Sequence, residues 1–249
     1  MEKGSIAHPA LWNVLHLPGF YHNPFCMASF RLYFTLLFLL ISFSSCFQIL
    51  EEITLRNNGT GEMLLTFNLS QSKSKLASIM LLDSVNGYKV PSEKDIQDYM
   101  NETVDFLKGS NGISNIKKSV DLKNYIFSVG FSFKEVGNIN GITQRLLSKQ
   151  KTKGPAISYS FDKVNGNFKK TYTHSAQMKK DYDQLKSKDK EIFKTAGFVS
   201  ISRFEKTVGS SSNKLSKISP SGKAVMTKAS ALELINGTAN ISNQIQLNK

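Results

Sequence analysis

The sequence predicts an α+β fold, in which hairpins form an antiparallel sheet and helices pack on one face of it. Apolar and polar residues alternate on both sides of Asn58-Gly59 and of Asn165-Gly166. An Asn-Gly pair accepts the positive φ angles of a tight hairpin turn, so each pair indicates a hairpin. Stretches with helical periodicity follow the paired strands, and a strand-turn-strand-helix unit therefore recurs three times. Sheets and helices in this order are typical of layered α+β domains.

The first unit contains the most clearly bounded helix. Its expected elements are strands at residues 53–55 and 63–69, a helix at residues 76–82 and a longer helix at residues 92–107. Ser92 is a good N-cap, Asp95 stands at the third helical position, and Gly109 can end the helix. The spacing of the apolar residues from Ile96 to Leu107 places them on one helix face.

The second and third units repeat the pattern, and a tail follows them. The expected elements are strands at 116–122 and 125–133, a short helix at 138–149, strands at 157–161 and 168–172, and a long helix at 175–195 that stops at Gly197. Residues 198–204 read as another strand. Residues 208–223 are rich in Ser, Gly and Lys and are predicted to be a loop. Residues 224–247 are expected to add two strands around a short helical turn.

An apolar segment near the start of the chain predicts export. Leu32–Ile41 contains Thr35 as its one clearly polar residue, and small polar residues follow it. This is the pattern of a secretory signal peptide, and the segment is shorter than the roughly 20 residues that span a bilayer. A signal anchor that extends to Leu50 is the alternative. Residues 1–26 fit poorly before such a signal, so we expect translation to begin at Met27; a long n-region is the alternative.

The end of this segment, Phe43-Ser44-Ser45-Cys46, resembles a bacterial lipobox, in a relaxed form with phenylalanine where leucine is usual. The stretches EEITLRNNGTGEMLLTFNLS and GISNIKKSVDLKNYIFSVGFSF also resemble uncharacterised envelope lipoproteins of Bacteroidetes. The resemblance implies a signal peptide at 27–45 and lipidation of Cys46 with fatty acyl chains such as palmitate. It implies a membrane anchor in the cell envelope, with the outer membrane favoured over the inner and the globular part outside the cytoplasm. A chance cysteine near a cleavage site is the alternative.

This interpretation divides the chain into four parts: an upstream extension at 1–26, the signal peptide at 27–45, a lipidated tether at 46–50 and one α+β domain at 51–249. After residue 45, Cys46 is the one cysteine and His174 the one histidine. The common nucleophile-base pairs and histidine zinc sites therefore lack their residues. The glycine patterns of nucleophile elbows and phosphate-binding loops are absent from the sequence as well. We expect no catalytic residue, no metal and no cofactor.

Two functions from different classes remain. The first is a non-catalytic binding or structural role in the cell envelope, with the partner unidentified. The second is an exported hydrolase that uses carboxylates alone, such as a glycosidase-like pair. Asp98, Glu102 and Asp105 share one face of the predicted helix, an arrangement more typical of a solvated surface than of a calcium site.

The chain is strongly basic, with a net charge of +13. Nucleic acid is disfavoured as a partner because the chain is predicted to be exported, arginine is scarce and no recognition motif is present. Anionic lipid or an envelope polysaccharide fits an anchored protein better, and an ordinary solvated surface is the alternative. The lysines expected to face such a surface are Lys179, Lys180, Lys186, Lys190, Lys206, Lys214, Lys217, Lys223 and Lys228.

Overall fold

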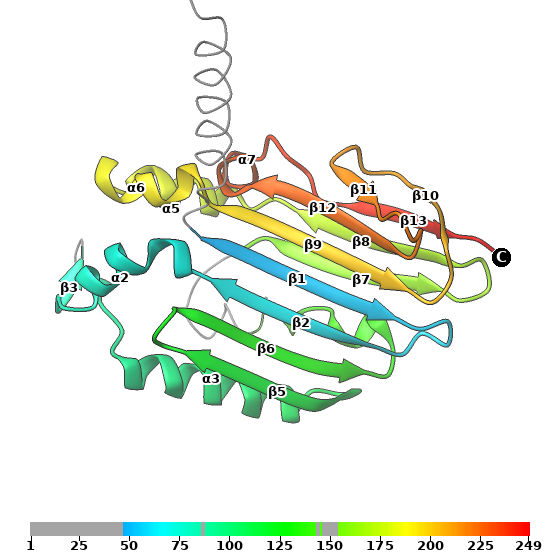
Figure 1. The fold of residues 1–249 in the computed structure, drawn as a ribbon, viewed down its shortest axis with the longest axis horizontal. Coiled ribbons are helices and arrows are strands. Elements are labelled where there is room, and N and C mark those ends of the chain that lie inside the picture. The colour runs from blue at the N-terminus through cyan, green and yellow to red at the C-terminus, as the bar shows by residue number, and fades with distance from the viewer. Residues whose placement is uncertain (1–46, 86–87, 143–144, 146–153) are drawn as a thin grey trace, which may run out of the picture. The chain divides into compact units, whose positions relative to one another are not determined.

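Two sheets lie face to face in the computed structural model and bury the side chains between them (Figure 1). The structure describes residues 47–85, 88–142, 145 and 154–249. All of these belong to one unit that runs from Ser44 to Lys249. The predicted α+β class is confirmed, with antiparallel pairing in nearly every ladder.

The first sheet has seven strands in the order β11-β12-β9-β1-β2-β6-β5. Its strands are β1 Gln48–Leu55, β2 Gly61–Asn68, β5 Ile113–Asp121, β6 Ile126–Phe133, β9 Gly197–Phe204, β11 Ser216–Ile218 and β12 Ala224–Ser230. Neighbours are antiparallel except β1 and β9, which run parallel. The hairpin turn predicted between β1 and β2 is present, and Gly59 has the expected positive φ of +88°.

The second sheet has four strands in the order β10-β13-β8-β7, and a separate two-stranded ladder joins β3 to β4. The bounds are β7 Ala156–Asp162, β8 Asn167–Thr173, β10 Val208–Ser211, β13 Asn243–Leu247, β3 Ser84–Val85 and β4 Tyr88–Lys89. The turn between β7 and β8 again uses an Asn-Gly pair, with φ of +65° at Gly166.

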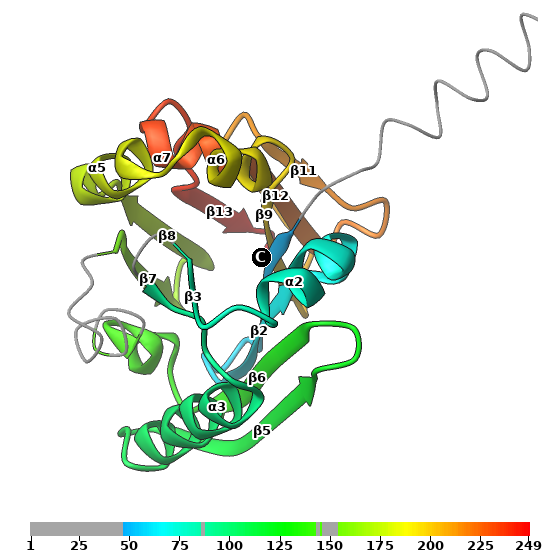
Figure 2. The ribbon, with the colours of Figure 1, turned by 90° about the vertical axis from the view of Figure 1, so that its left-hand side faces the viewer.

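Helices pack against the ends of the strands and along one side of the two sheets (Figure 2). They are α2 Lys73–Ile79, α3 Glu93–Lys108, α5 Ala176–Gln184, α6 Ser187–Lys194 and α7 Ala231–Asn236, with short 3-10 turns at Ser70–Ser72 (η1) and Val136–Ile139 (η2). Helix α3 is the helix predicted at residues 92–107. Ser92 and Asp95 form a reciprocal capping box at its start, and Gly109 follows its last residue.

The larger core cluster lies between the sheets and reaches α3. It combines Ile53 and Leu55 of β1, Phe168 of β8 and Ile245 of β13 with Leu107 of α3. These side chains alternate with outward-facing residues along each strand, as period two requires. A smaller cluster around Ile241 lies beside α7.

Three details differ from the sequence analysis. Residues 208–223 are not one loop, because they contain β10 and β11. The long helix expected at 175–195 is two helices, because the backbone is extended at Leu185 and Lys186, with ψ of 144° and 152°. Gln48–Leu50, expected in a tether, are the first residues of β1. Part of the helix expected at 138–149 falls outside the described residues.

Candidate functional site

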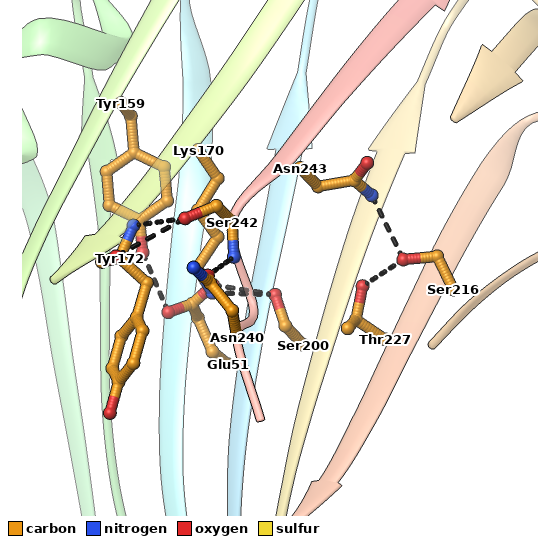
Figure 3. Close-up of polar contacts among 10 residues, drawn as sticks. All are labelled: Glu51, Tyr159, Lys170, Tyr172, Ser200, Ser216, Thr227, Asn240, Ser242 and Asn243. Carbon is orange, nitrogen blue, oxygen red and sulfur yellow. Dashed lines mark hydrogen bonds and ion pairs between the residues drawn. The ribbon is translucent and has the colours of Figure 1, made fainter. Parts of the chain in front are cut away.

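A charged cluster is buried between the two sheets (Figure 3). Glu51 of β1 and Lys170 of β8 form an ion pair, with 2.6 Å between Lys170 Nζ and Glu51 Oε1. Ser200 of β9 donates to the same oxygen at 2.8 Å, and the hydroxyl of Tyr159 of β7 donates to Glu51 Oε2 at 2.7 Å. Lys170 Nζ also donates to Ser200 Oγ at 3.1 Å. Four strands from both sheets therefore meet at one carboxylate.

Burial sets the electrostatics of this cluster. The side chains of Lys170 and Glu51 are only 4% and 3% exposed. Lys170 Nζ lies 4.9 Å from the ring centroid of Phe198 and 5.8 Å from that of Tyr159, so aromatic faces surround the cation where water would otherwise lie. Burial, together with the Glu51 charge and hydrogen bond, raises the pKa of Tyr159 well above its ordinary value. The cluster is a hydrogen-bonded network with almost no exposure to solvent.

The cluster contains a serine and a lysine in contact, which is the pair used by some nucleophilic hydrolases. Lys170 Nζ donates both to Glu51 and to Ser200 Oγ, so it is placed as a donor to the serine and not as its base. Ser200 is buried as well, and none of the four residues lines the open groove described below. The geometry fits a link between the sheets better than a catalytic centre.

A second buried cluster explains why the serine-rich segment is ordered. The side chain of Asn243, on β13, is buried, and its Oδ1 accepts hydrogen bonds from Ser211 Oγ, Ser212 Oγ and the Asn213 amide. Its Nδ2 donates to Ser216 Oγ at 3.0 Å. Asn243 thus holds both ends of the β10–β11 connection, and serine hydroxyls make the contacts.

One buried hydroxyl lacks a partner. Tyr172 Oη is shielded from solvent and has no hydrogen bond among the described residues. Its ring packs in the smaller core cluster with Phe198, Leu234 and Ile241. Burial raises the pKa of Tyr172. Tyr172 does not line the groove described below, and an unsatisfied buried hydroxyl is a local cost to stability.

An open groove of about 670 Å³ lies on the outer face of the first sheet. Gly130 of β6 forms part of its floor, since a side chain there would meet Leu64. Two carboxylates line it, those of Glu52 and Glu62. Glu52 is ion-paired with Arg203 at 2.9 Å and Glu62 with Arg56 at 2.6 Å. Each of the two groove carboxylates is therefore held by an arginine rather than by the other carboxylate.

The carboxylates singled out in the sequence do not form a site. Asp98 and Asp105 of α3 pair with Lys94 and Lys108 on the helix surface. Within the described residues, no group of three or more His, Cys, Asp or Glu side chains is placed to hold a metal ion. His174 Nε2 lies 2.9 Å from the Ile235 carbonyl at the end of α7, which is a structural contact.

The predicted lysines separate into groups at different places, and Cys46 lies outside the described residues. Lys179 pairs with Asp183, and Lys190 Nζ bonds the Asp183 carbonyl and lies over the Tyr182 ring. These contacts and the nearby acidic residues offset much of the positive charge of this region, which also contains Lys180 on α5 and Lys186 just before α6. The others lie along β10 to β12 and in their connections: Lys206, Lys214, Lys217, Lys223 and Lys228.

The buried charged cluster was not predicted from the sequence, although the sequence carries a signal of it. Glu51 occupies an inward position of an alternating strand, two residues before Ile53, and Lys170 stands between Phe168 and Tyr172 in the same way. A charge at an apolar position of the pattern indicates a buried partner. The sequence could not say which charges meet, because Glu51 and Lys170 are far apart in the chain.

Comparisons with known proteins add little to the description of this site. No family model and no curated protein matches the chain. Among solved structures, the NMR structure of the folded domain of the LppM protein of Mycobacterium tuberculosis is similar, with 9% identity and a TM-score of 0.41 over 82% of this chain and 91% of that one. A similarity of this degree establishes neither a shared fold nor a shared activity. None of the helices in the described residues is long and apolar enough to cross a bilayer.

Proposed function

We propose that this protein is an envelope lipoprotein, anchored through Cys46, with a non-catalytic binding or structural role. The position of Phe47 carries the proposal. Its ring packs edge-on against Phe193 of α6, with 5.7 Å between centroids, and its carbonyl accepts the Gly197 amide at 3.0 Å. Cys46 is thus bonded directly to a residue that is part of the fold. A lipid on Cys46 would hold the domain against the membrane without an intervening linker.

Two further points support the anchor. The apolar segment 32–41 and the small residues before Cys46 match the order of a lipoprotein signal, and the Bacteroidetes-type resemblance favours the outer membrane. Each buried methylene contributes about 0.8 kcal/mol, so two or three acyl chains give stable anchoring where one is marginal. The non-catalytic role is supported by the buried Ser200 and Lys170, whose polar atoms already serve the structure.

Intact-mass analysis of the membrane-extracted protein tests the anchor. We expect a chain that begins at Cys46 and carries added acyl mass, and we expect Cys46→Ser to abolish that mass and shift the protein out of the membrane fraction. An unmodified mature chain in the soluble fraction would refute the proposal. Mutation of Ser45, which is not acylated, to Ala serves as the matched control and should leave the acyl mass unchanged.

The rival function, an exported hydrolase, is favoured by one observation: Glu52 and Glu62 line the same groove. If they form a catalytic pair, the purified protein should cleave envelope polysaccharide, and Glu52→Gln or Glu62→Gln should each abolish cleavage. Glu93→Gln, on the exposed start of α3, is the control. Turnover that survives both groove substitutions would exclude this pair.

A further inference from the structure

Three segments that are distant in sequence meet at the end of the fold where the described chain begins. Gln48, at the start of β1, pairs with Asn68, the last residue of β2, and with Gly197, the first of β9. Helix α2 follows β2 through η1, and Lys75 Nζ donates to the Lys188 carbonyl of α6 at 3.3 Å. Figure 1 shows α2, α6 and the start of β1 together at the left. We call the surface formed by α2, residues 80–82 and α6 the entry surface.

The entry surface exposes large apolar side chains. Leu81 is 87% exposed and Leu82 is 51% exposed, directly after α2. The turn is ordered, since the Leu82 amide donates to the Ile79 carbonyl at 2.9 Å. Helix α2 has no buried residue and contributes to neither core cluster. Two adjacent exposed leucines on an ordered turn indicate an interaction site more than a packing defect.

Exposed lysines stand on α2 and at the start of α6, which are joined by the hydrogen bond from Lys75 to the Lys188 carbonyl. Lys73 and Lys75 of α2 are exposed, as are Lys186 and Lys188 at the start of α6. A surface that carries both exposed leucines and exposed lysines matches the boundary between acyl chains and anionic headgroups, where apolar tips insert and cations remain in water. Phe47, which follows Cys46 in the chain, lies at the same end of the fold, against Phe193 of α6.

We propose that the entry surface docks on an anionic membrane, with Leu81 and Leu82 inserted and the four lysines at the headgroups. This inference rests on the proposed anchor, which would bring the surface to the bilayer, and it names the partner of the surface. The proposal excludes Lys206 and Lys223 from that contact. They lie beyond the other end of β9, whose eight residues span about 23 Å, whereas the Debye length is about 8 Å.

The test uses the full chain as purified from membranes, reconstituted in phosphatidylethanolamine vesicles with or without phosphatidylglycerol. The anchor is the same in both vesicles, so a difference reports the surface alone. We expect amides of residues 73–85 to exchange with deuterium about tenfold more slowly on the anionic vesicles. Leu81→Ser with Leu82→Ser should remove that protection, and Lys73→Gln with Lys75→Gln should reduce it.

Val164 provides a matched control, because it is 92% exposed and lies at the other end of the molecule. It belongs to the β7–β8 turn, where Lys163 approaches Gly59 of the β1–β2 turn. Val164→Ser should leave the protection unchanged. Since Leu81, Leu82 and Val164 are all exposed, the double leucine variant and Val164→Ser should both keep the thermal stability of the parent chain.

The remaining outcomes distinguish the docking of the entry surface from the lipid anchor at Cys46. Equal exchange of residues 73–85 on both vesicles, in a chain with confirmed acyl mass, would overturn the docking and leave the anchor intact. Protection in whole cells without protection on vesicles would overturn it in favour of a protein partner. If the chain carries no acyl group, the anchor fails. Sedimentation of that same chain with anionic vesicles, dependent on Leu81 and Leu82, would then support the docking by itself.

Discussion

At the scale of single residues, two buried tyrosines differ in one feature, the partner of the hydroxyl. Tyr159 donates to the Glu51 carboxylate at 2.7 Å, whereas Tyr172 Oη has no partner among the described residues. A hydrogen bond to a charged group contributes about 1.5–3 kcal/mol, and an unsatisfied buried hydroxyl costs about 1–3 kcal/mol. Replacement of the tyrosine by phenylalanine should therefore lower the stability of the fold at position 159 and should not lower it at position 172.

We predict that Tyr159→Phe lowers the free energy of unfolding by about 2 kcal/mol and that Tyr172→Phe leaves it unchanged or raises it by about 1 kcal/mol. Urea unfolding followed by circular dichroism measures both. Equal destabilisation by the two variants would show that the Tyr172 hydroxyl has a partner.

The raised pKa of Tyr159 adds a pH dependence. Above about pH 10 the unfolded chain loses the tyrosine proton while the folded chain keeps it, so stability falls as the pH rises. The slope per tyrosine is at most about 1.4 kcal/mol per pH unit. We predict a shallower decline between pH 10 and pH 11 for Tyr159→Phe than for the parent chain. Parallel declines would contradict the assignment.

The Glu51–Lys170 ion pair should behave as one unit. Lys170→Met leaves a buried carboxylate without its cation and should cost about 3–5 kcal/mol. Lys170→Met combined with Glu51→Leu removes both charges and should recover much of that loss. A double-mutant cycle by denaturant unfolding measures the coupling between the two residues. A double variant as unstable as the sum of the single variants would show that the pair does not act as a unit.

At the scale of elements, local hydrogen bonds define the ends of α3. Ser92 Oγ accepts the Asp95 amide at 3.1 Å, and Asp95 accepts the Ser92 amide at 2.8 Å. Hydrogen bonds from Ser92 to the Asp95 carboxylate, from the backbone amide first, are the main reason that the pKa of Asp95 falls to about 2. The contribution of this carboxylate is present above about pH 4 and is lost as the pH falls toward 2.

We predict that Ser92→Ala lowers the free energy of unfolding by about 1 kcal/mol and speeds amide exchange in the first turn of α3. Ser110→Ala, beyond the end of the same helix, is the control and should leave that turn unchanged. An unaltered first turn in Ser92→Ala would mean that tertiary packing alone holds the start of the helix.

The connection between β10 and β11 is held by hydrogen bonds to Asn243 of β13. Asn243→Ala removes the acceptor shared by Ser211, Ser212 and Asn213. We predict that limited proteolysis then cuts within residues 212–215, which the parent chain should resist. Early cleavage there in the parent chain would favour the loop expected from composition.

At the scale of the whole molecule, one core cluster joins distant parts of the chain. Ile53 and Leu107 from the first half pack in the same cluster as Phe204, Val225 and Ile245 from the second half. The buried Glu51–Lys170 pair links the halves again. Neither half has a complete apolar interior by itself.

We therefore propose that residues 51–249 unfold as a single domain. Calorimetry of the full chain should give one transition with equal calorimetric and van't Hoff enthalpies. Val225→Ala, in the second half, should lower the unfolding temperature reported by α3 as much as that of the second sheet. Two resolved transitions would show two domains.

The sequence by itself determined the fold class, both Asn-Gly turns and both ends of α3, because each depends on residues within a few positions of one another. Only the tertiary structure decided that the serine-rich segment forms strands, that the long helix breaks at Leu185, and that Glu51 meets Lys170. Composition predicted a loop at 208–223 because serine and glycine favour turns locally, but Asn243 from a later strand supplies the hydrogen bonds that order it. The exposed Leu81 and Leu82 are visible in the sequence as two apolar residues among many; that they lie beside the chain entry depends on strand pairing between residues that are distant in sequence.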